Sequence, residues 1–580
     1  MANGHRAPLL TACVFLIICA AATLVVVYTA FPVSLNPCTY SLPRALITVS
    51  GLHPYVVSCQ GDAVTAPLSD GSKNTGGPVE TSLRTCVKPT LPPHPLPPFY
   101  CCPPAPASEP INFTLPDPAE PVRVRRPTHA AGAAEHMAKY ERAIALMRAL
   151  PDDDPRSFYQ LANVHCAYCT GSYRQTGHPE LHMQIHFSWL FFPFHRAYLY
   201  FFERIAARLL GDPGFALPFW GWDVPEGMRM PAEFANSSSP LYDPARNPAH
   251  APPAVVDLDF ARVEGNLTDE QRVQQNLRIM YRQMVGNAAL PSLFHGQPFR
   301  AGQSDMPGAG TVELTPHNAM HTWTGDLTLR NVEDMGTYYS AGRDPLFYPH
   351  HGNIDRLWEA WRDVGAARGY RGHVDFTDPD WLDSSFLFYD EEARLVRITV
   401  RDVLDVDKLR YRFDDVGMPW ADARPTPTPN VNGNKPSSSS SSLKSVSFPL
   451  SLDTAVTVEV RRPRVLRGRP EKELHEEVLV VEGIETDGTE MVKFDAYVNA
   501  MEYEKVGPSG RELAGSYLCL SHPSTDGTGK GMTVETSMRM ALNELLEDLG
   551  ADGDESVTVT LVPRHGKVKI GGLKIVYIME

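Results

Sequence analysis

The stretch from His165 to Arg204 constrains this chain of 580 residues more than any other segment. It holds five histidines and two cysteines among dense aromatic residues, and its run WLFFPFHRAYLYFF is typical of a buried helix. A buried imidazole must find a partner, because an unpaired polar group in an apolar interior raises the free energy of the folded state. Several imidazoles in one such segment therefore indicate a bound metal ion.

A second set of histidines follows further along the chain. His317 and His321 in ELTPHNAMHTW are four residues apart, so one face of a helix would present both. His350 and His351 in DPLFYPHHGNIDRLW are adjacent, and their side chains diverge. Imidazoles with few carboxylates nearby favour copper, zinc, iron or nickel. Three histidines per ion would leave a position open for a substrate or for oxygen, and two such sites would form a dinuclear centre.

Spacing alone does not decide which histidines bind the metal. His178, His182 and His186 recur every four residues, so any two of them could share a helix face. A single histidine in such a set is more often a hydrogen-bonded core or surface residue than a ligand. The sequence pattern therefore predicts a metal centre without a unique set of ligands.

The N-terminal segment differs in character from the rest of the chain. Residues 9–31 carry no charge and exceed the roughly 20 apolar residues that span a bilayer. We expect residues 1–31 to be a signal anchor or signal peptide, with membrane anchoring through residues 9–31 favoured, and residues 32–80 to be a targeting remnant or spacer. The length predicts two to four domains, and the net charge of −15 disfavours nucleic acid as a partner.

A low-complexity run separates the last part of the chain from the rest. The run ARPTPTPNVNGNKPSSSSSSLKS is typical of a flexible linker, which we place at residues 424–445. Beyond it, segments such as HEEVLVVEGI and SVTVTLVP alternate apolar and polar residues, which predicts strands. We therefore expect residues 446–580 to form a β-rich domain of sandwich or barrel type.

The cysteines give a further constraint. Cys101 and Cys102 lie in the proline-rich segment LPPHPLPPFYCCPPAPASEP, which can form little regular structure of its own. Disulfides would attach this arm to the core and would favour a non-reducing compartment. Metal ligands or free thiols are the alternative interpretation.

Four motifs together resemble a known family. They are HCAYC at 165–169, HFSWLFFPFHRAYLYFFER at 186–204, PHNAMHTWTGD at 316–326 and DPLFYPHHGNIDRLW at 344–358. In order and spacing they resemble the plant polyphenol oxidases, the tyrosinase and catechol oxidase group with a type-3 dinuclear copper centre. DPDWLDSSFLFYDE is similar to the DWL region of that family, KLRYRF to its tyrosine motif, and VKFDAYV to its KFDV region, with Ala496 where valine is common.

The resemblance implies a fold and a domain order. We expect a mainly α catalytic domain, a four-helix bundle around the dicopper centre, over residues 81–375. The DWL-like region and tyrosine motif would follow at 376–423, then the linker at 424–445. Residues 446–580 would be a KFDV-like lid domain that keeps the enzyme latent until a protease cuts the linker.

The resemblance also implies the residues of the site. The first copper ion would be held by His165, His186 and His195, and the second by His317, His321 and His351, which excludes His178, His182 and His350. Cys169 would form a thioether with His186, and the disulfides would be Cys86–Cys102 and Cys101–Cys166. Glu313 and Asn318 would orient a water that serves as a base, and Tyr338 would occupy the gate position over the second copper ion, which is commonly phenylalanine.

The function implied by the resemblance is the oxidation of small phenols. Two copper ions would use dioxygen as co-substrate to oxidise o-diphenols to o-quinones, with or without hydroxylation of monophenols. The alternative is reversible oxygen binding of the haemocyanin type. The N-terminus has neither a serine-rich basic transit region nor a twin-arginine before its apolar run. We therefore expect the protein to enter the secretory pathway and to be vacuolar or a membrane-anchored lumenal form. The thylakoid lumen is the alternative location.

Overall fold

The computed structural model describes residues 76–89, 91–92, 99–105, 108–260, 267–304, 306–426, 446–463, 468–472, 474–522 and 533–579. The predicted anchor or signal peptide, the spacer up to residue 75 and nearly all of the linker lie outside these residues. Within the ranges given, no helix combines the length and the apolar character needed to cross a membrane.

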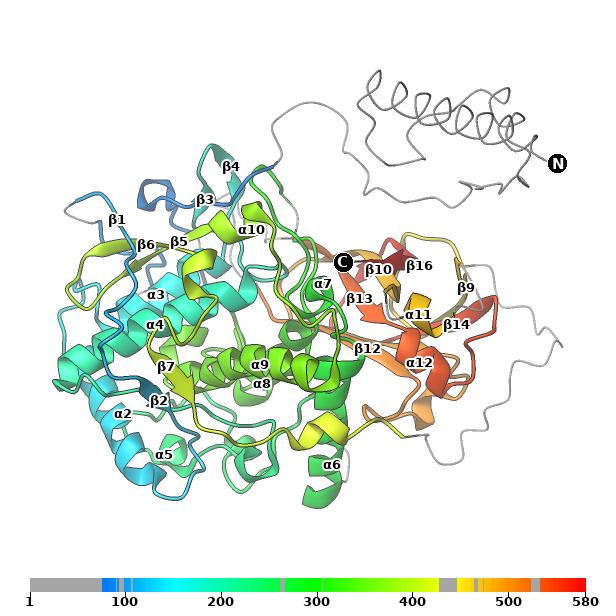
Figure 1. Cartoon of the computed structure of the whole chain (residues 1–580), viewed down its shortest axis with the longest axis horizontal. Helices are drawn as coiled ribbons and strands as arrows, with labels where there is room; N and C mark the ends of the chain where they lie inside the picture. The colour runs from blue at the N-terminus through cyan, green and yellow to red at the C-terminus, as the bar shows by residue number, and fades with distance from the viewer. Residues whose placement is uncertain are drawn as a thin grey trace, which may run out of the picture. The chain divides into compact units, whose positions relative to one another are not determined.

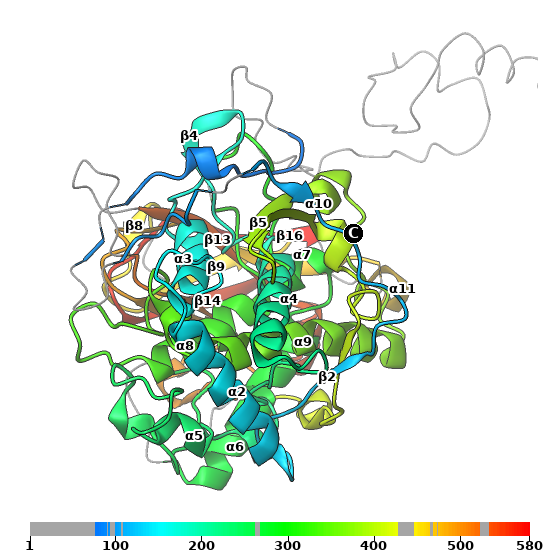
Figure 2. The ribbon, with the colours of Figure 1, turned by 90° about the vertical axis from the view of Figure 1, so that its left-hand side faces the viewer.

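The first half of the described chain is helical, as predicted. Its helices are α2 (Ala133–Arg148), α3 (Phe158–Cys169), α4 (Phe191–Leu210), α5 (Ala232–Ala235), α6 (Asp269–Tyr281), α7 (Pro291–Phe294), α8 (Asn318–Thr324) and α9 (Phe347–Arg368). The two views in Figures 1 and 2 show α3, α4, α8 and α9 gathered together, and these helices carry most of the candidate ligands. The expected helical catalytic core is therefore present.

Helix α4 forms the centre of this helical core. Its aromatic residues are almost all buried, so hydrophobic burial rather than amphipathic patterning stabilises it. Phe202 stacks on Tyr348 of α9 at 3.7 Å between ring centroids, which fixes the two helices against each other. Both helices end at a glycine in the left-handed conformation, Gly211 at φ 65° and Gly369 at φ 70°, where a side chain would be strained.

Short strands attach the DWL-like region to the helical core. A three-stranded sheet has the order β1-β6-β5, and β2 pairs with β7 in parallel. The elements are β1 (Ile111–Asn112), β2 (Arg123–Arg125), α10 (Pro379–Asp383), β5 (Ser385–Tyr389), β6 (Leu395–Thr399) and β7 (Tyr411–Phe413). Residues 76–80, which we expected in the spacer, also join this part: Val79 is fully buried and its carbonyl accepts from the amide of Ser385 at 2.9 Å.

The C-terminal part is strand-rich, as predicted, and forms a sandwich of two sheets. One sheet has the order β12-β11-β14-β9, and the other has the order β13-β10-β15-β8 with β16 paired to β10. Side chains from both sheets share one apolar cluster, so the sheets pack face to face. The elements are β8 (Leu450–Ser451), β9 (Val456–Arg461), α11 (Arg469–Lys472), β10 (Glu476–Thr486), β11 (Val492–Val498), β12 (Leu513–Cys519), β13 (Val534–Ala541), α12 (Asn543–Asp548), β14 (Ser556–His565), β15 (Lys569–Ile570) and β16 (Gly572–Ile578).

Candidate metal centre

Two groups of buried histidines face each other inside the helical core. In each group the nitrogens that could bind a metal lie within 4.8 Å of one another. The first group is His165, His186 and His195, and the second is His317, His321, His350 and His351. The rings of His195 and His351 stack across the two groups at 4.1 Å between centroids. The arrangement is that of two adjacent metal sites.

Backbone carbonyls hold several of these rings in one orientation. The Nδ1 atoms of His165, His195 and His321 lie 3.0, 2.8 and 2.8 Å from the carbonyl oxygens of Tyr338, Phe191 and Met335. Such a bond places the proton on Nδ1 and leaves the Nε2 lone pair free to bind a metal. The buried Nε2 atoms of His165, His195 and His317 have no hydrogen-bond partner among the described residues, and a metal ion would satisfy them.

The imidazoles are neutral at physiological pH, as metal ligands must be. Burial lowers the pKa of His195 to about 3 and that of His321 to about 4. The Nε2 atoms of His321 and His351 lie 3.4 Å apart. This separation is about what two nitrogens have when each binds the same tetrahedral ion at roughly 2.0–2.1 Å. The donor set therefore fits a borderline metal such as copper.

A tryptophan distinguishes the two adjacent histidines. The indole Nε1 of Trp222 donates to the Nδ1 of His350 at 3.1 Å. A neutral imidazole accepts at one nitrogen and carries its proton on the other, so the Nε2 of His350 is protonated and has no lone pair for a metal. His351 has no such restriction, because its Nδ1 has no partner within the described part of the chain. The geometry favours His351 over His350 as the ligand.

The remaining histidines of the opening stretch lie elsewhere. His178 and His182 belong to the short strand β4 (His178–His182), which pairs with β3 (Arg174–Gln175) and is partly exposed. The Nδ1 of His182 lies 2.8 Å from the carbonyl oxygen of Gly171. The recurrence every four residues that we noted in the sequence has no structural meaning here, because these residues are not helical.

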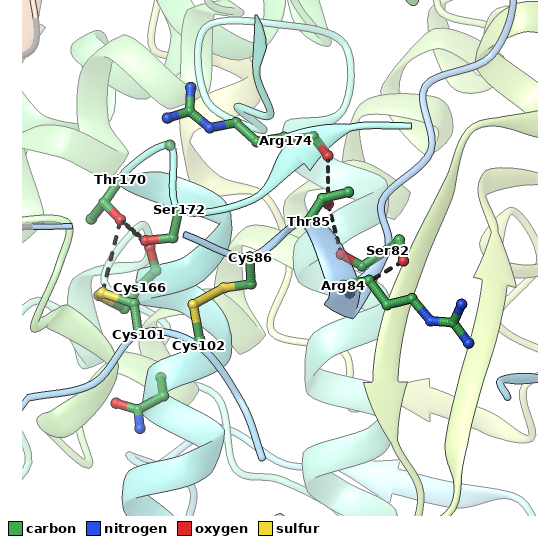
Figure 3. Close-up of a disulfide and its surroundings, with 12 residues drawn as sticks. Ser82, Arg84, Thr85, Cys86, Cys101, Cys102, Cys166, Thr170, Ser172 and Arg174 are labelled. Atoms are coloured by element: carbon green, nitrogen blue, oxygen red, sulfur yellow. Dashed lines mark hydrogen bonds between the residues drawn. A yellow bond between two sulfur atoms is a disulfide. The ribbon is translucent and has the colours of Figure 1, made fainter. Parts of the chain in front are cut away.

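One disulfide attaches the proline-rich arm to helix α3, and a second attaches it to the segment that precedes the arm. Cys101 is bonded to Cys166, which is next to His165, and Cys86 is bonded to Cys102. Figure 3 shows the Cys86–Cys102 bond, with Cys101 and Cys166 labelled beside it at the end of α3. Cys169, the last residue of α3, is buried and forms no disulfide. The Cys101–Cys166 bond therefore attaches the middle of the arm next to His165 of the first group of histidines.

Glu313 and Asn318 lie next to His317 of the second group, whereas Tyr338, expected over the second copper ion, lies against His186 of the first group. Glu313 belongs to the π-helical turn η6 (Glu313–His317); its Oε1 accepts from the amide of Phe187 at 2.7 Å. Its Oε2 has no hydrogen-bond partner among the residues described, and burial raises the pKa of this carboxyl well above its ordinary value. The hydroxyl of Tyr338 donates to the Oδ1 of Asn318 at 3.2 Å, and the Tyr338 ring lies 4.3 Å from that of His186.

The C-terminal domain reaches directly into this site. The Nδ2 of Asn318 donates to the carbonyl oxygen of Leu518 at 2.7 Å. The ring of His522 lies 4.4 Å from that of Tyr338, and the buried Cys519 is in the same segment. Sequence reasoning missed His522 and Trp222, because neither stands in a ligand-like pattern and only the packing of distant segments brings them to the centre.

Known proteins match the chain along most of its described length. The common central domain of tyrosinase matches residues 155–364, the polyphenol oxidase middle domain matches 375–426, and the chloroplastic polyphenol oxidase C-terminal domain matches 448–577. The chloroplastic polyphenol oxidase of Malus domestica is 49% identical over 491 residues, which cover 82% of this chain and 81% of that protein. The aureusidin synthase of Antirrhinum majus is 46% identical over 513 residues, covering 87% of this chain and 89% of that protein.

Solved structures give the same result. The structure of latent apple tyrosinase has 49% sequence identity and a TM-score of 0.75, and the match covers 81% of this chain and 100% of that one. A recombinant latent aurone synthase has 40% identity and a TM-score of 0.80, with 87% of this chain and 99% of that one covered. Sequence, fold and histidine geometry agree, and the chain belongs to the plant polyphenol oxidase family.

Proposed function

We propose that this protein oxidises o-diphenols to o-quinones with dioxygen at a dinuclear copper centre, and that its C-terminal domain holds it in a latent form. The observation that carries this proposal is the pair of facing histidine groups, in which the buried Nε2 atoms of His165, His186, His195 and His317 have no hydrogen-bond partner in the described structure. Membership of an enzyme family whose relatives include latent forms supports turnover over the haemocyanin-like alternative of reversible oxygen binding.

The ligands we propose divide evenly between the two groups. His165, His186 and His195 would hold one copper ion, and His317, His321 and His351 would hold the other. Copper, when bound, supplies the binding and reduction of dioxygen. The protein supplies neutral ligands that are held by backbone carbonyls and packed against buried aromatic rings such as those of Phe191 and Phe347.

Glu313 is our candidate for the group that takes the phenol proton. In the closed molecule burial favours its neutral form, since the pKa of the carboxyl is raised well above the ordinary value. Solvent access after the lid leaves would lower that pKa and convert Glu313 into a base, acting directly or through a water. Asn318 would regain a free amide group at the same time, because its present acceptor is Leu518 of the lid.

Two further roles concern the walls of the site. A thioether between Cys169 and His186 would restrain a ligand ring whose two nitrogens have no hydrogen-bond partner in the described chain. Peptide mapping of the mature protein tests this: a cross-linked pair of peptides that lacks two hydrogens is expected, and two separate unmodified peptides would exclude the bond. Tyr338 would line the entrance, where its hydroxyl remains anchored on Asn318.

The activity is tested on copper-loaded protein from which the C-terminal domain has been removed. Oxygen uptake and quinone absorbance are measured with catechol, and with tyramine as a monophenol. We expect rapid quinone formation from catechol. Protein that contains two copper ions and binds dioxygen reversibly, but forms no quinone from either substrate, would favour the oxygen-carrier alternative.

The compartment we propose is the thylakoid lumen of the chloroplast. Several relatives are named as chloroplastic, which supports the thylakoid alternative and gives no support to a vacuolar location. A fusion of residues 1–80 to a fluorescent protein should enter plastids. Accumulation of the fusion in the vacuole or endomembranes would restore the secretory expectation.

A further inference from the structure

Described residues outside the linker make extensive contacts between the two domains. Leu290 and Leu293 of the catalytic domain pack against strands β10 and β13. Phe187 and Leu314, which flank the metal centre, pack into the apolar core of the C-terminal sandwich. The two domains therefore share apolar cores, as permanently associated subunits do.

Catalytic-domain side chains also satisfy the free edge of strand β12. This strand is at the edge of its sheet, and an uncovered edge exposes backbone groups that need partners. Asn287 donates to the carbonyl oxygen of Ala514 at 2.8 Å, as Asn318 does to that of Leu518 at 2.7 Å. Just before the strand, Arg282 donates to the carbonyl oxygen of Gly510 at 2.6 Å. Just after it, Thr337 and Ser521 form a parallel bridge.

The lysine of the KFDA motif (residues 493–496, within VKFDAYV) adds a buried ion pair to the interface. The Nζ of Lys493 lies 2.9 Å from the Oδ2 of Asp259 in the catalytic domain and donates to the Asp259 carbonyl oxygen at 2.7 Å. Both side chains are at most 5% exposed. On the other side, Asp495 of the same motif lies 3.7 Å from Lys493 and accepts from Ser516 of β12 at 2.8 Å. The motif thus connects the lid strand to the catalytic domain.

We propose that this interface works without the linker: after a cut within residues 427–445, the severed C-terminal domain stays bound to the catalytic domain and continues to inhibit it. The proposal rests on the latency described above and refines it. Cleavage would permit the lid to leave, whereas displacement or degradation of the lid would start turnover. The KFDA lysine would act as the latch that retains the severed domain.

The physical reason is that a flexible linker contributes only an effective concentration. For a short flexible linker the effective concentration is on the order of millimolar. A cut therefore weakens the closed state only by the ratio of this effective concentration to the actual concentration of the protein. The hydrogen bonds on β12, the shared apolar cores and the Lys493–Asp259 pair all remain. Loss of one partner of a buried charge pair weakens an interface by about 10²-fold or more, so this pair is the most sensitive point.

The test uses the full chain with a specific protease site placed between residues 431 and 440. After complete cleavage, gel filtration at micromolar concentration should give one species that contains both pieces, and catechol turnover should change by less than about twofold. Asp259→Asn and Lys493→Met, one in each domain, should lower the affinity of the pieces by about 10²-fold and release activity on dilution. Lys569→Met, which removes an exposed ion pair with Glu485 inside the lid, is the matched control and should behave as the unmodified chain.

The outcomes separate this proposal from the proposed activity. If the severed pieces of the unmodified sequence part at micromolar concentration, or become fully active on cutting alone, the latch proposal is wrong. If the pieces of Asp259→Asn part but the copper-loaded catalytic piece forms no quinone, the proposed activity fails while the latch stands. Circular dichroism of both interface variants before cleavage checks that each domain is folded.

Discussion

Replacement of Asp355 gives the sharpest test of how the helices that carry the candidate ligands are held together. Asp355 lies one helical turn after His351 on α9 and is 2% exposed. Its Oδ1 accepts from the Nε of Arg196 at 2.5 Å, and its Oδ2 accepts from Arg125 at 2.7 Å and from the hydroxyl of Tyr411 at 2.6 Å. Arg196 follows His195 on α4, so one carboxylate joins the two helices that carry ligands of different groups.

The substitution Asp355→Asn keeps the shape and removes the charge. An amide accepts through one oxygen only, and its NH₂ faces donors that it cannot bond. Two buried guanidinium groups then lose part of their neutralisation, and removal of one partner from such a network costs about 3–5 kcal/mol. The matched control is Asp383→Asn, whose pair with Arg401 is about half exposed and contributes roughly 0–1 kcal/mol.

The assay is chemical unfolding of the copper-free and copper-loaded proteins, followed by tryptophan fluorescence. Trp358 is a suitable reporter, because the guanidinium of Arg196 lies 3.8 Å from the centroid of its ring. We expect the free energy of the first unfolding transition to fall by about 3–5 kcal/mol. We also expect the variant to retain less copper after dialysis against a chelator. A loss below about 1 kcal/mol, equal to that of the control, would refute the view that this carboxylate holds the two helices together.

Three further predictions concern the ligands, the lid and the arm. His351→Ala should halve the bound copper measured by elemental analysis, whereas His350→Ala should retain both ions; the reverse result would overturn the tautomer argument. Burial lowers the pKa of His522 to about 4, and an open lid would return it to about 6.5, so the closed state loses stability as the pH falls from 6.5 towards 4. From pH 7 to 5 the activity of the full chain should therefore rise by up to about 20-fold through this residue, and His522→Gln should abolish that part of the rise. Cys101→Ser opens a loop with a sequence separation of 65 and should lower stability by about 4 kcal/mol, against about 3 for Cys86→Ser with its separation of 16; equal thermal stability of all three proteins would contradict this.

Local patterns in the sequence were enough to predict the main helix of the core and the strands of the C-terminal domain. Aromatic density around His195 predicts a buried helix because burial of such rings outweighs every local preference, and α4 confirms it. Alternation beyond residue 446 predicts strands, and the two-sheet sandwich confirms that prediction. The helical core and β-rich lid followed from these periodicities and from the family motifs.

Position along the chain could not reveal which distant groups meet. Asp355 is adjacent to Arg356 in the sequence, yet its partners are Arg125 and Arg196, because adjacent residues on a helix point in different directions. His178 and His182 had helical spacing but lie on a strand, so the period that favoured them was irrelevant.

Histidines among buried aromatic residues indicate a metal centre from the sequence alone, because residue types are local properties of the chain. The family and the lid came from the resemblance of the motifs to the plant polyphenol oxidases. The assembly of the centre is visible only in the folded molecule. Trp222 sets the tautomer of His350, and Leu518 of the lid engages Asn318 across 200 residues of chain. Such contacts depend on packing in three dimensions, where hydrogen-bond geometry acts over a few ångströms irrespective of sequence distance.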